Sequence, residues 1–149
     1  MYVYRITTAK WANVLSASGY PARWNGKGVF SLYTAESRSL ACLENLVHRS
    51  GSGIAANFKV ITIEIPDDLE VEIFDVNKLA KDWKLYRQMR LSQNLGDEWY
   101  RSQRTCILKV PSAIIPEESN YLINTSHIYF RKIKFFEVND FLFDERLGL

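Results

Sequence analysis

A basic side chain, an aromatic ring and a carboxylate follow one another in residues 21–48, PARWNGKGVFSLYTAESRSLACLENLVH. Arg23 stands beside flexible glycines in ARWNGKG, and a guanidinium can bind phosphate through two parallel hydrogen bonds. Tyr33 ends the apolar run GVFSLY, and Glu44 lies in the amphipathic stretch that follows. A loop, a strand and a helix could therefore bring these three side chains to one cleft that binds phosphate.

Glu44 is the least expected of these residues, because it falls on the apolar side of its predicted helix. At about 100° per residue, Leu40, Leu43 and Val47 cluster on one stripe, and Glu44 projects only about 40° from Leu40. An unpaired buried carboxylate is costly, so it must be paired, protonated or open to a cleft. The ordinary alternative is a boundary glutamate that reaches water or pairs with an arginine.

Arg23 and Tyr33 also have ordinary structural explanations, as a surface arginine in a tight loop and as a half-buried packing residue. The glycines match neither the G-x-x-x-x-G-K-[ST] phosphate loop nor the G-x-G-x-x-G dinucleotide fingerprint. Neither His48 nor His127 has a partner at metal-ligand spacing, so we expect no metal site.

The elements that must position these residues are mostly strands. Apolar alternation predicts strands over residues 1–6, 28–33, 57–65, 69–76, 105–110, 120–124 and 132–138. A helix is predicted from a cap at Thr34 to about His48, before Gly51 and Gly53. Residues 77–94 are predicted to be helical in parts, and a further short helix could start at Asp97. We therefore predict an α+β fold with small mixed or antiparallel sheets and flanking helices.

Length and composition suit one domain over residues 1–149. The net charge of +2, from 19 basic and 17 acidic side chains, does not by itself indicate nucleic acid or a membrane surface as partner. Cys42 and Cys106 match no metal spacing, and two small buried thiols are more expected than a disulfide. Without a signal peptide or an apolar run of about 20 residues, a cytoplasmic protein is expected.

The segment ARWNGKGVFSLYTAESRSLACLENLVH resembles the signature of the RES domain family, the toxins of RES–Xre type II toxin–antitoxin systems. The resemblance continues in LGDEWYRSQRTCILKVPSAIIPEESNYLINTSHIYFRKIKF, which contains Ser112, and in the ending FLFDERLGL. Thr125 and Ile128 stand where family members often have proline, whereas Asn124 and His127 are kept. The match covers nearly the whole chain.

The resemblance implies a fold similar to that of ADP-ribosyltransferases, with two small sheets around an NAD cleft. It implies that NAD⁺ is a substrate and that no cofactor is needed, and it implies an Xre-type antitoxin that covers the active site. Carried over onto this sequence, it marks Glu44, Tyr33 and Arg23 as catalytic. It marks Arg23 and Tyr33, together with Asn25 and Ser112, as substrate-binding.

These residue types suit cleavage of the nicotinamide–ribose bond. The reaction passes through an oxocarbenium-like transition state, and nicotinamide leaves as a neutral molecule, so one carboxylate can suffice. We expect Glu44 to stabilise the charge on the ribose, Tyr33 to stack on the pyridinium and Arg23 to clamp the pyrophosphate. Ser112 would bond the carboxamide or a phosphate, and Asn25 would orient Arg23 or the substrate.

Two alternatives to general NAD⁺ degradation remain at this point. The first is a toxin that transfers ADP-ribose to a protein, because the sequence does not identify the acceptor. The second and remoter one is an RNA-binding or RNA-cleaving protein, favoured by the basic and aromatic stretches KDWKLYRQMR and RKIK. The charge balance and the missing RNA-binding motif argue against it, so no direct nucleic-acid binding is expected.

Overall fold

The computed structural model describes residues 1–48 and 57–147. Its strands are β1 (Tyr2–Thr8), β2 (Ser31–Ala35), β3 (Phe58–Glu64), β4 (Val71–Ile73), β5 (Ile107–Pro111), β6 (Ser119–Asn124) and β7 (Lys134–Phe141). The α-helices are α1 (Arg38–His48) and α2 (Met89–Ser102). Short 3-10 helices are η1 (Ala9–Trp11), η2 (Val76–Lys78), η3 (Tyr86–Gln88), η4 (Ile128–Lys132) and η5 (Glu145–Leu147).

The strands of the described residues form one mixed sheet in the order β4-β5-β6-β2-β1-β3-β7. Only β4 and β5 run parallel among the described pairs. The predicted α+β class with a mixed sheet and flanking helices is therefore confirmed, although the strands join into one sheet.

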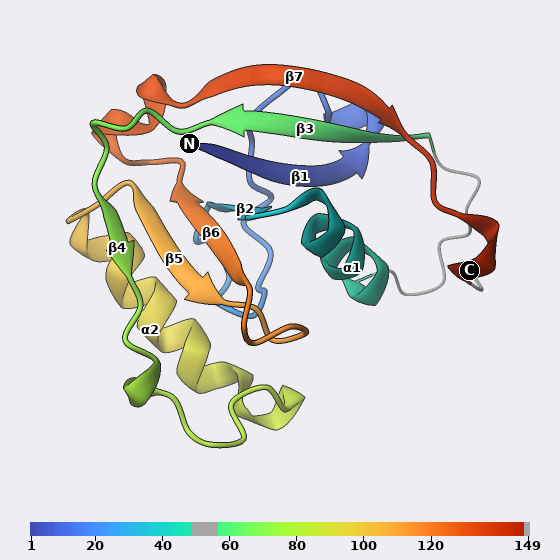
Figure 1. The fold of residues 1–149 in the computed structure, drawn as a ribbon. Helices are drawn as coiled ribbons and strands as arrows, with labels where there is room; N and C mark the ends of the chain where they lie inside the picture. Colours follow the sequence, from blue (N-terminus) through green and yellow to red (C-terminus); the bar gives the residue numbers. More distant parts are fainter. Residues whose placement is uncertain (49–56, 148–149) are drawn as a thin grey trace.

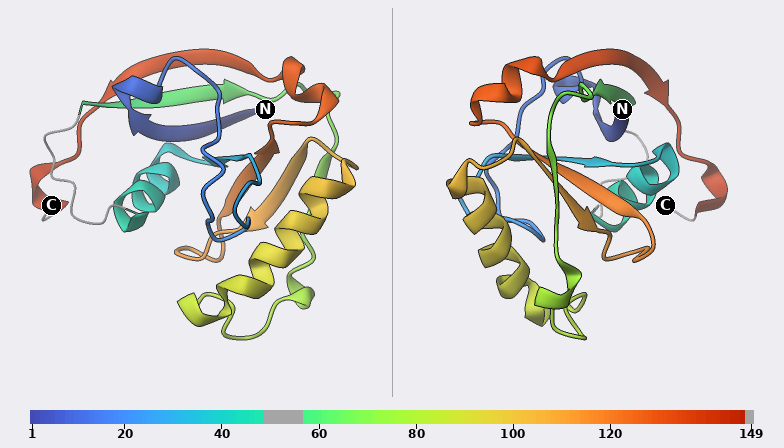
Figure 2. Two further views of the ribbon diagram at one scale, coloured as in Figure 1. Left: turned by 180° about the vertical axis from the view of Figure 1, so that it is seen from behind. Right: turned by 60° about the vertical axis from the view of Figure 1, so that its left-hand side comes forward.

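The sheet opens between β2 and β1. β1 pairs with β3 from Tyr2↔Glu64 to Thr8↔Phe58, whereas it pairs with β2 only at Tyr4↔Ala35. The layer of β1, β3 and β7 therefore diverges from the half that contains β4, β5 and β6, as Figure 1 shows. α1 lies beside this opening, and α2 lies well apart from it along β5 (Figure 2).

Side-chain alternation places a continuous core on one face of the sheet. Leu32, Ile123 and Ile107 lie in register across β2, β6 and β5, and they cluster with Ile61 and Ile63 of β3. This core joins the two halves behind the opening. On the other face the core is divided, because one cluster lies under α1 and a tryptophan cluster lies beside α2. The divided face leaves room for a cavity.

Most predicted strands are confirmed, with shifted ends, and the predicted strand over residues 69–76 is reduced to β4. The predicted helix start at Asp97 is wrong, because α2 already begins at Met89. Its buried side is formed by Ser92, Gly96 and Trp99, and two of these are too small to give an apolar signal.

The helix that carries Glu44 also differs in detail from the prediction. The cap at Thr34 is wrong, because this residue lies in β2 and its hydroxyl donates to the carbonyl of Tyr121. The helix starts later, and the hydroxyl of Ser37 accepts from the N–H of Leu40. α1 ends at His48 within the described part of the chain, while Gly51 and Gly53 lie outside it.

The predicted apolar stripe of α1 is wrong in two of its three residues. Leu40 is fully buried, but Leu43 is 37% exposed and Val47 is 65% exposed. Leu40 and Ala41 are instead the residues that pack under the helix. This buried side still contains Glu44, which follows Leu40 by one turn.

Cys42 and Cys106 are thiols and form no disulfide with each other. Cys106 is buried and Cys42 is half-buried, so the expectation of thiols over a disulfide is confirmed. Burial raises the pKa of the Cys106 thiol to about 11, which keeps it protonated and unreactive at neutral pH.

Candidate functional site

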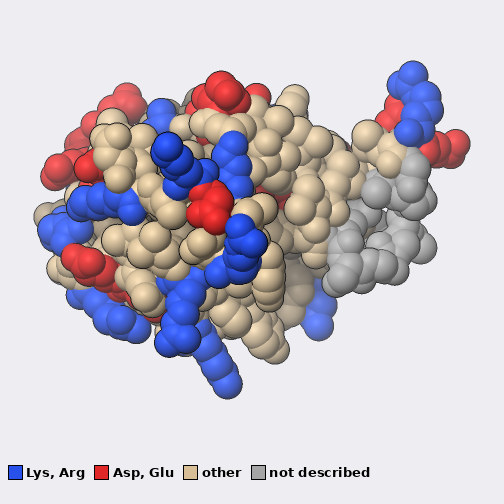
Figure 3. All heavy atoms as spheres, turned by 90° about the horizontal axis from the view of Figure 1, so that it is seen from below, with Lys and Arg blue, Asp and Glu red and all other residues tan. Residues whose placement is uncertain are grey.

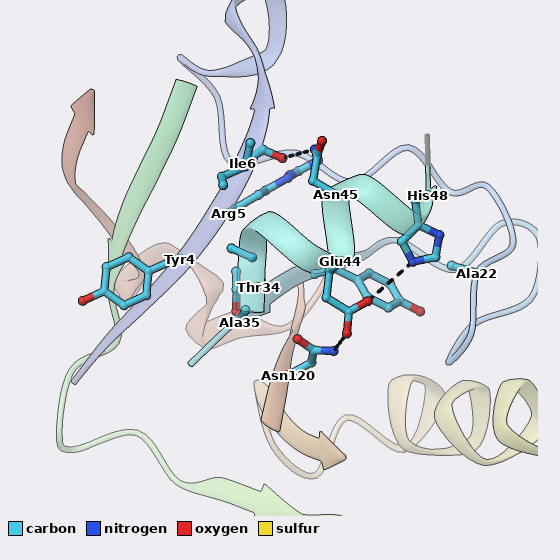
Figure 4. Close-up of a pocket in the computed structure, with 12 residues that line it drawn as sticks. Tyr4, Arg5, Ile6, Ala22, Thr34, Ala35, Glu44, Asn45, His48 and Asn120 are labelled. Carbon is cyan, nitrogen blue, oxygen red and sulfur yellow. Dashed lines mark hydrogen bonds and ion pairs between the residues drawn. The ribbon is translucent and has the colours of Figure 1, made fainter. Parts of the chain in front are cut away.

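A cavity of about 230 Å³ lies where the sheet opens. Residues of β1, β2, α1 and β6 line it, together with Ala22 from the loop before β2. Figure 4 shows that Glu44 lies among these residues, with Asn120 on one side and Asn45 and Arg5 on the other. The cavity therefore contains one carboxylate, one guanidinium and several amide and aromatic groups.

Glu44 projects from α1 toward the strands of the opposite half. Its Oε1 accepts a hydrogen bond from Ser112 Oγ at 2.9 Å and another from Asn120 Nδ2 at 2.5 Å. Its Oε2 lies 3.7 Å from His48 Nε2, one turn further along the helix. The Glu44 side chain is 21% exposed, so the carboxylate is neither solvated freely nor closed off from the cavity.

These contacts decide the ionisation of Glu44. Burial alone would raise its pKa, but the contact with His48 and the hydrogen bonds from Asn120 and Ser112 outweigh burial. The pKa of Glu44 therefore lies below its ordinary value, and the side chain is a carboxylate at neutral pH. The predicted conflict between burial and charge is resolved by hydrogen bonding.

Tyr33 lines the cavity from β2, and its hydroxyl is fixed by the loop before that strand. The hydroxyl donates to Asn25 Oδ1 at 2.7 Å and accepts from the N–H of Trp24 at 3.0 Å. Asn25 is buried and donates to the carbonyls of Tyr20 and Gly26. Burial raises the pKa of Tyr33, so the phenol stays neutral. Asn25 thus orients the aromatic ring of Tyr33.

α2 holds this loop through one of its faces. Ser92 Oγ donates to the carbonyl of Arg23 at 2.7 Å, and Gln93 Nε2 donates to that of Ala22 at 2.8 Å. Asp97 Oδ1 accepts from the N–H of Gly26 at 2.8 Å. At Gly96 a Cβ atom would lie 1.9 Å from the carbonyl oxygen of Trp24, so only glycine allows this approach.

The side chain of Arg23 lies outside the cavity lining. Its Nη1 donates to the carbonyls of Trp83 and Leu85 at 3.0 and 3.3 Å, and its Nη2 donates to that of Lys84 at 2.9 Å. Burial lowers the pKa of Arg23, while the charge of Glu44 raises it in the opposite sense. The guanidinium of Arg23 thus anchors the segment before η3. It also interacts electrostatically with the Glu44 carboxylate in the cavity.

Arg5 and Asn120 line the cavity, but sequence reasoning missed both. Arg5 Nη1 donates to the carbonyl of Ser16 at 2.9 Å, and within the described residues no carboxylate pairs with it. Burial lowers the pKa of Arg5. The signal that singled out Glu44 was available for both, since each is a polar residue inside an apolar strand, in YVYRIT and NYLIN.

Asn124 and His127 shape the turn that follows β6. Asn124 Nδ2 donates to the carbonyl of Tyr100 at 3.0 Å, and His127 Nδ1 accepts from the N–H of Tyr129 at 3.1 Å. His127 Nε2 lies 3.1 Å from the carbonyl of Gln103. These contacts tie the turn to the end of α2, away from the cavity lining.

Two further properties concern the part of the chain that the structure describes. No group of His, Cys, Asp and Glu there could hold a metal ion. None of its helices is both long enough and apolar enough to cross a membrane.

Both the sequence and the fold of this chain are similar to those of known toxins. A curated relative from Sphingobium sp. (strain YBL2), named Prs ADP-ribosylating toxin, is 37% identical over 95% of this chain and 98% of its own length. A Toxin Res from Photorhabdus laumondii is 34% identical over 99% of this chain and 97% of its own length. A chain in the crystal structure of the M. tuberculosis MbcT–MbcA toxin–antitoxin complex has the same fold. It superposes with a TM-score of 0.76 at 18% identity, over 95% of this chain and 84% of that one. The RES domain model matches residues 2–141, and the chain therefore belongs to the RES domain family of toxins.

Proposed function

We propose that this toxin consumes NAD⁺ by cleaving the bond between nicotinamide and ribose. The observation that carries the proposal is the ionised Glu44 carboxylate, which is held in a cavity beside the Tyr33 ring and beside Arg5, an arginine with no carboxylate partner among the described residues. NAD⁺ combines a cationic ring, a ribose and a pyrophosphate, so it offers a partner to each of these three groups.

Glu44 is the group that would act on the ribose. As the nicotinamide bond breaks, positive charge develops on the sugar, and a carboxylate fixed beforehand stabilises it without reorganising. Nicotinamide leaves as a neutral molecule, so the site needs no general acid. The Tyr33 ring would bind the cationic pyridinium, a contact of about 0.5–2 kcal/mol.

The two arginines would bind the pyrophosphate from different positions. Arg5 lines the cavity and has no carboxylate partner among the described residues, so a phosphate would supply the missing negative charge. Arg23 lies outside the cavity lining and uses Nη1 and Nη2 for backbone carbonyls, so its Nε–H would be the donor to the part of the pyrophosphate that lies outside the cavity. A cavity of about 230 Å³ is smaller than sites for drug-sized ligands, about 300–1,000 Å³. We therefore infer that the cavity encloses only the nicotinamide, its ribose and the adjoining phosphate, and that the adenosine end lies outside.

The acceptor of ADP-ribose defines two versions of this function. General NAD⁺ degradation, with water or phosphate as acceptor, is our first choice. Protein ADP-ribosylation is the alternative, and it is supported by the relative named Prs ADP-ribosylating toxin. Both versions share the same first bond cleavage at Glu44, and we propose that it takes place in the cytoplasm, where NAD⁺ is abundant.

An enzyme that drains NAD⁺ requires an inhibitor in its own cell. We propose an Xre-type antitoxin that inserts a segment at the cavity mouth, since the similar M. tuberculosis chain comes from a toxin–antitoxin complex. A carboxylate-containing segment would suit Arg5 and Arg23 by imitating the phosphates of the substrate. Co-expression of the adjacent gene should restore growth, and its product should co-purify and block NAD⁺ loss.

The decisive experiment measures free nicotinamide after incubation of the purified protein with NAD⁺. Glu44→Gln should abolish release while circular dichroism and melting show a folded protein, and Glu117→Gln, at an exposed glutamate, should behave as wild type. Mass spectrometry of the products, with and without phosphate and with cell lysate, separates hydrolysis, phosphorolysis and protein modification. Wild-type nicotinamide release by Glu44→Gln would exclude the proposal.

A nucleic-acid function remains the remoter candidate. Lys81, Lys84 and Arg87 are exposed in the segment that leads into α2, and Arg90 is exposed in its first turn. Figure 3 shows Lys and Arg gathered on this side of the molecule, although acidic side chains are interspersed. Asp82 pairs with Arg87, which reduces the positive charge available to phosphates. Incubation with RNA under the same conditions tests this candidate, and intact RNA is the expected result.

A further inference from the structure

The two oxygens of the Glu44 carboxylate have different surroundings. Oε1 accepts both strong hydrogen bonds, from Ser112 and from Asn120. Oε2 has one contact among the described residues, to His48 at 3.7 Å, which is beyond hydrogen-bond distance. The His48 side chain is 67% exposed, so it does not bury Oε2. Oε1 is thus held by two hydrogen bonds, whereas Oε2 has only the longer contact to His48 within the described residues, so Oε2 is the oxygen that a ligand can reach.

Asn120 is built to hold its side chain in one place. It lies in β6, paired with Ala35 of β2 on one side and with Val110 of β5 on the other. Its backbone is therefore fixed from both sides, and the residue is only 8% exposed. A side chain on such a strand has little freedom to follow a displaced α1, so it acts as a fixed reference for Glu44.

Ser112 has its only proton directed to the same oxygen. The Ser112 side chain is fully buried, and its Oγ accepts from the N–H groups of Ile114 and Ile115 at 3.0 and 3.1 Å. With these acceptor positions occupied, the hydroxyl hydrogen is left for Glu44. Ser112 thus supports the carboxylate, and its hydroxyl is already engaged before substrate arrives.

We propose that Asn120 is a positioning residue which, with Ser112, holds Oε1 of Glu44 and presents Oε2 as the oxygen that meets the ribose. The catalytic part of this inference rests on the proposed function. The positioning part concerns the carboxylate itself and holds for any substrate. A carboxylate with one held oxygen cannot rotate about its terminal bond, so the free oxygen keeps a defined direction into the cavity.

The amide of Asn120 can donate a hydrogen bond to Glu44 Oε1, whereas an alanine or an ionised aspartate at this position cannot. Asn120→Ala removes one of the two donors to Oε1, so Ser112 alone holds this oxygen and the carboxylate is fixed less firmly. Asn120→Asp keeps the shape but places a second carboxyl group beside Glu44, and two such groups cannot both ionise at this distance. Both changes should raise the pKa of Glu44, and Asn120→Asp should raise it more.

The test measures the Glu44 carboxyl directly, by carbon-13 NMR titration of the side-chain carboxyl in the folded protein. Asn120→Ala should move the Glu44 titration upward by about one pH unit, and Asn120→Asp should move it further. Asn124→Ala, at another buried asparagine of β6 whose contacts are to Tyr100 and Ser126, is the matched control and should leave it in place. An unchanged Glu44 titration in folded Asn120→Ala and Asn120→Asp would overturn the proposal, whether or not the protein consumes NAD⁺.

Steady-state kinetics then test whether Oε2 of Glu44 is the oxygen that acts on the ribose. With NAD⁺ as substrate, Asn120→Ala should lower kcat by on the order of 10- to 100-fold with little change in KM. The acid limb of the pH–rate profile of Asn120→Ala should move to higher pH, by the same amount as the Glu44 titration measured by NMR. A shifted titration with wild-type kcat would overturn the role of Oε2. If the wild-type protein releases no nicotinamide, the proposed function fails, while the titration still decides whether Asn120 positions Glu44.

Discussion

Glu44 and Asn45 are neighbours on α1, yet they hydrogen-bond to strands on opposite sides of the opening in the sheet. Glu44 accepts from Asn120 of β6, whereas Asn45 Nδ2 donates to the carbonyl of Ile6 in β1 at 3.0 Å. β1 and β2 meet at a single residue pair beside this point. One turn of α1 therefore bridges the two halves of the sheet, so the position of the carboxylate is tied to the shape of the cavity.

The stability of the protein should depend on the ionisation of Glu44. Its pKa in the folded protein lies below the ordinary value, so the ionised side chain stabilises the fold above the unfolded-state pKa, about 4.3. This stabilisation is lost as the pH falls through the folded pKa. Between about pH 6 and pH 3, wild type should lose more of its free energy of unfolding than Glu44→Gln does, as measured by urea denaturation. Parallel curves for the two proteins would contradict this assignment.

Arg5 should contribute to substrate binding. Arg5→Gln removes the charge that would face a phosphate, and we expect KM for NAD⁺ to rise about 10- to 100-fold with a smaller change in kcat, because a charge-assisted hydrogen bond is worth roughly 1.5–3 kcal/mol. Steady-state kinetics measure both constants. Arg90→Gln, at an exposed arginine, is the control. An unchanged KM in folded Arg5→Gln would show that Arg5 has only a structural role.

Arg23 should combine binding with anchoring. Arg23→Lys cannot reproduce a planar fork that reaches three carbonyls and a phosphate together, so KM should rise more than kcat falls. The segment around Lys84 should also become more sensitive to limited proteolysis, since its carbonyls lose their donor. Wild-type kinetics combined with faster proteolysis would restrict Arg23 to anchoring.

Tyr33 should separate the effect of a ring from that of a hydroxyl. Tyr33→Phe keeps the ring but leaves Asn25 Oδ1 and the N–H of Trp24 without this partner, so stability should fall by about 1–3 kcal/mol. Nicotinamide release by the folded variant should fall only modestly. Tyr33→Leu keeps apolar bulk but has no π face, so it should have a higher KM for NAD⁺ than Tyr33→Phe has. Equal kinetics for the two variants would exclude stacking on the pyridinium.

Gly96 should tolerate no side chain, although alanine normally favours a helix by about 1 kcal/mol over glycine. Gly96→Ala would drive Cβ into the carbonyl of Trp24, and we expect a loss of about 2 kcal/mol or more. The loop that carries Arg23 and Asn25 should shift with it, so NAD⁺ consumption should fall as well. Asn94→Ala, on the exposed side of α2, is the control, and both variants are compared by thermal unfolding. Stabilisation by Gly96→Ala would contradict the close contact.

Local residue patterns determined much of this protein. The apolar β-branched and aromatic residues in segments such as YVYRIT and NFKVITIEI predicted β1 and β3, because these residue types favour strands. The place of Glu44 on the buried side of its helix predicted that its carboxylate needs partners, because burying an unpaired carboxylate is too costly. The order of arginine, tyrosine, glutamate and serine also carried the resemblance to the RES family, which the family match confirms.

Only the tertiary structure decided which groups meet. Ser112 and Asn120 lie 68 and 76 residues from Glu44, and the pairing of β5 with β6 brings both to one carboxylate oxygen. Arg5 reaches the cavity because β1 and β2 diverge after one pair, which no alternation pattern encodes. Leu43 and Val47 point away from the core because α1 packs through Leu40 and Ala41. Periodicity specifies which residues share a face, whereas long-range packing selects the face that is buried and the partners it finds there.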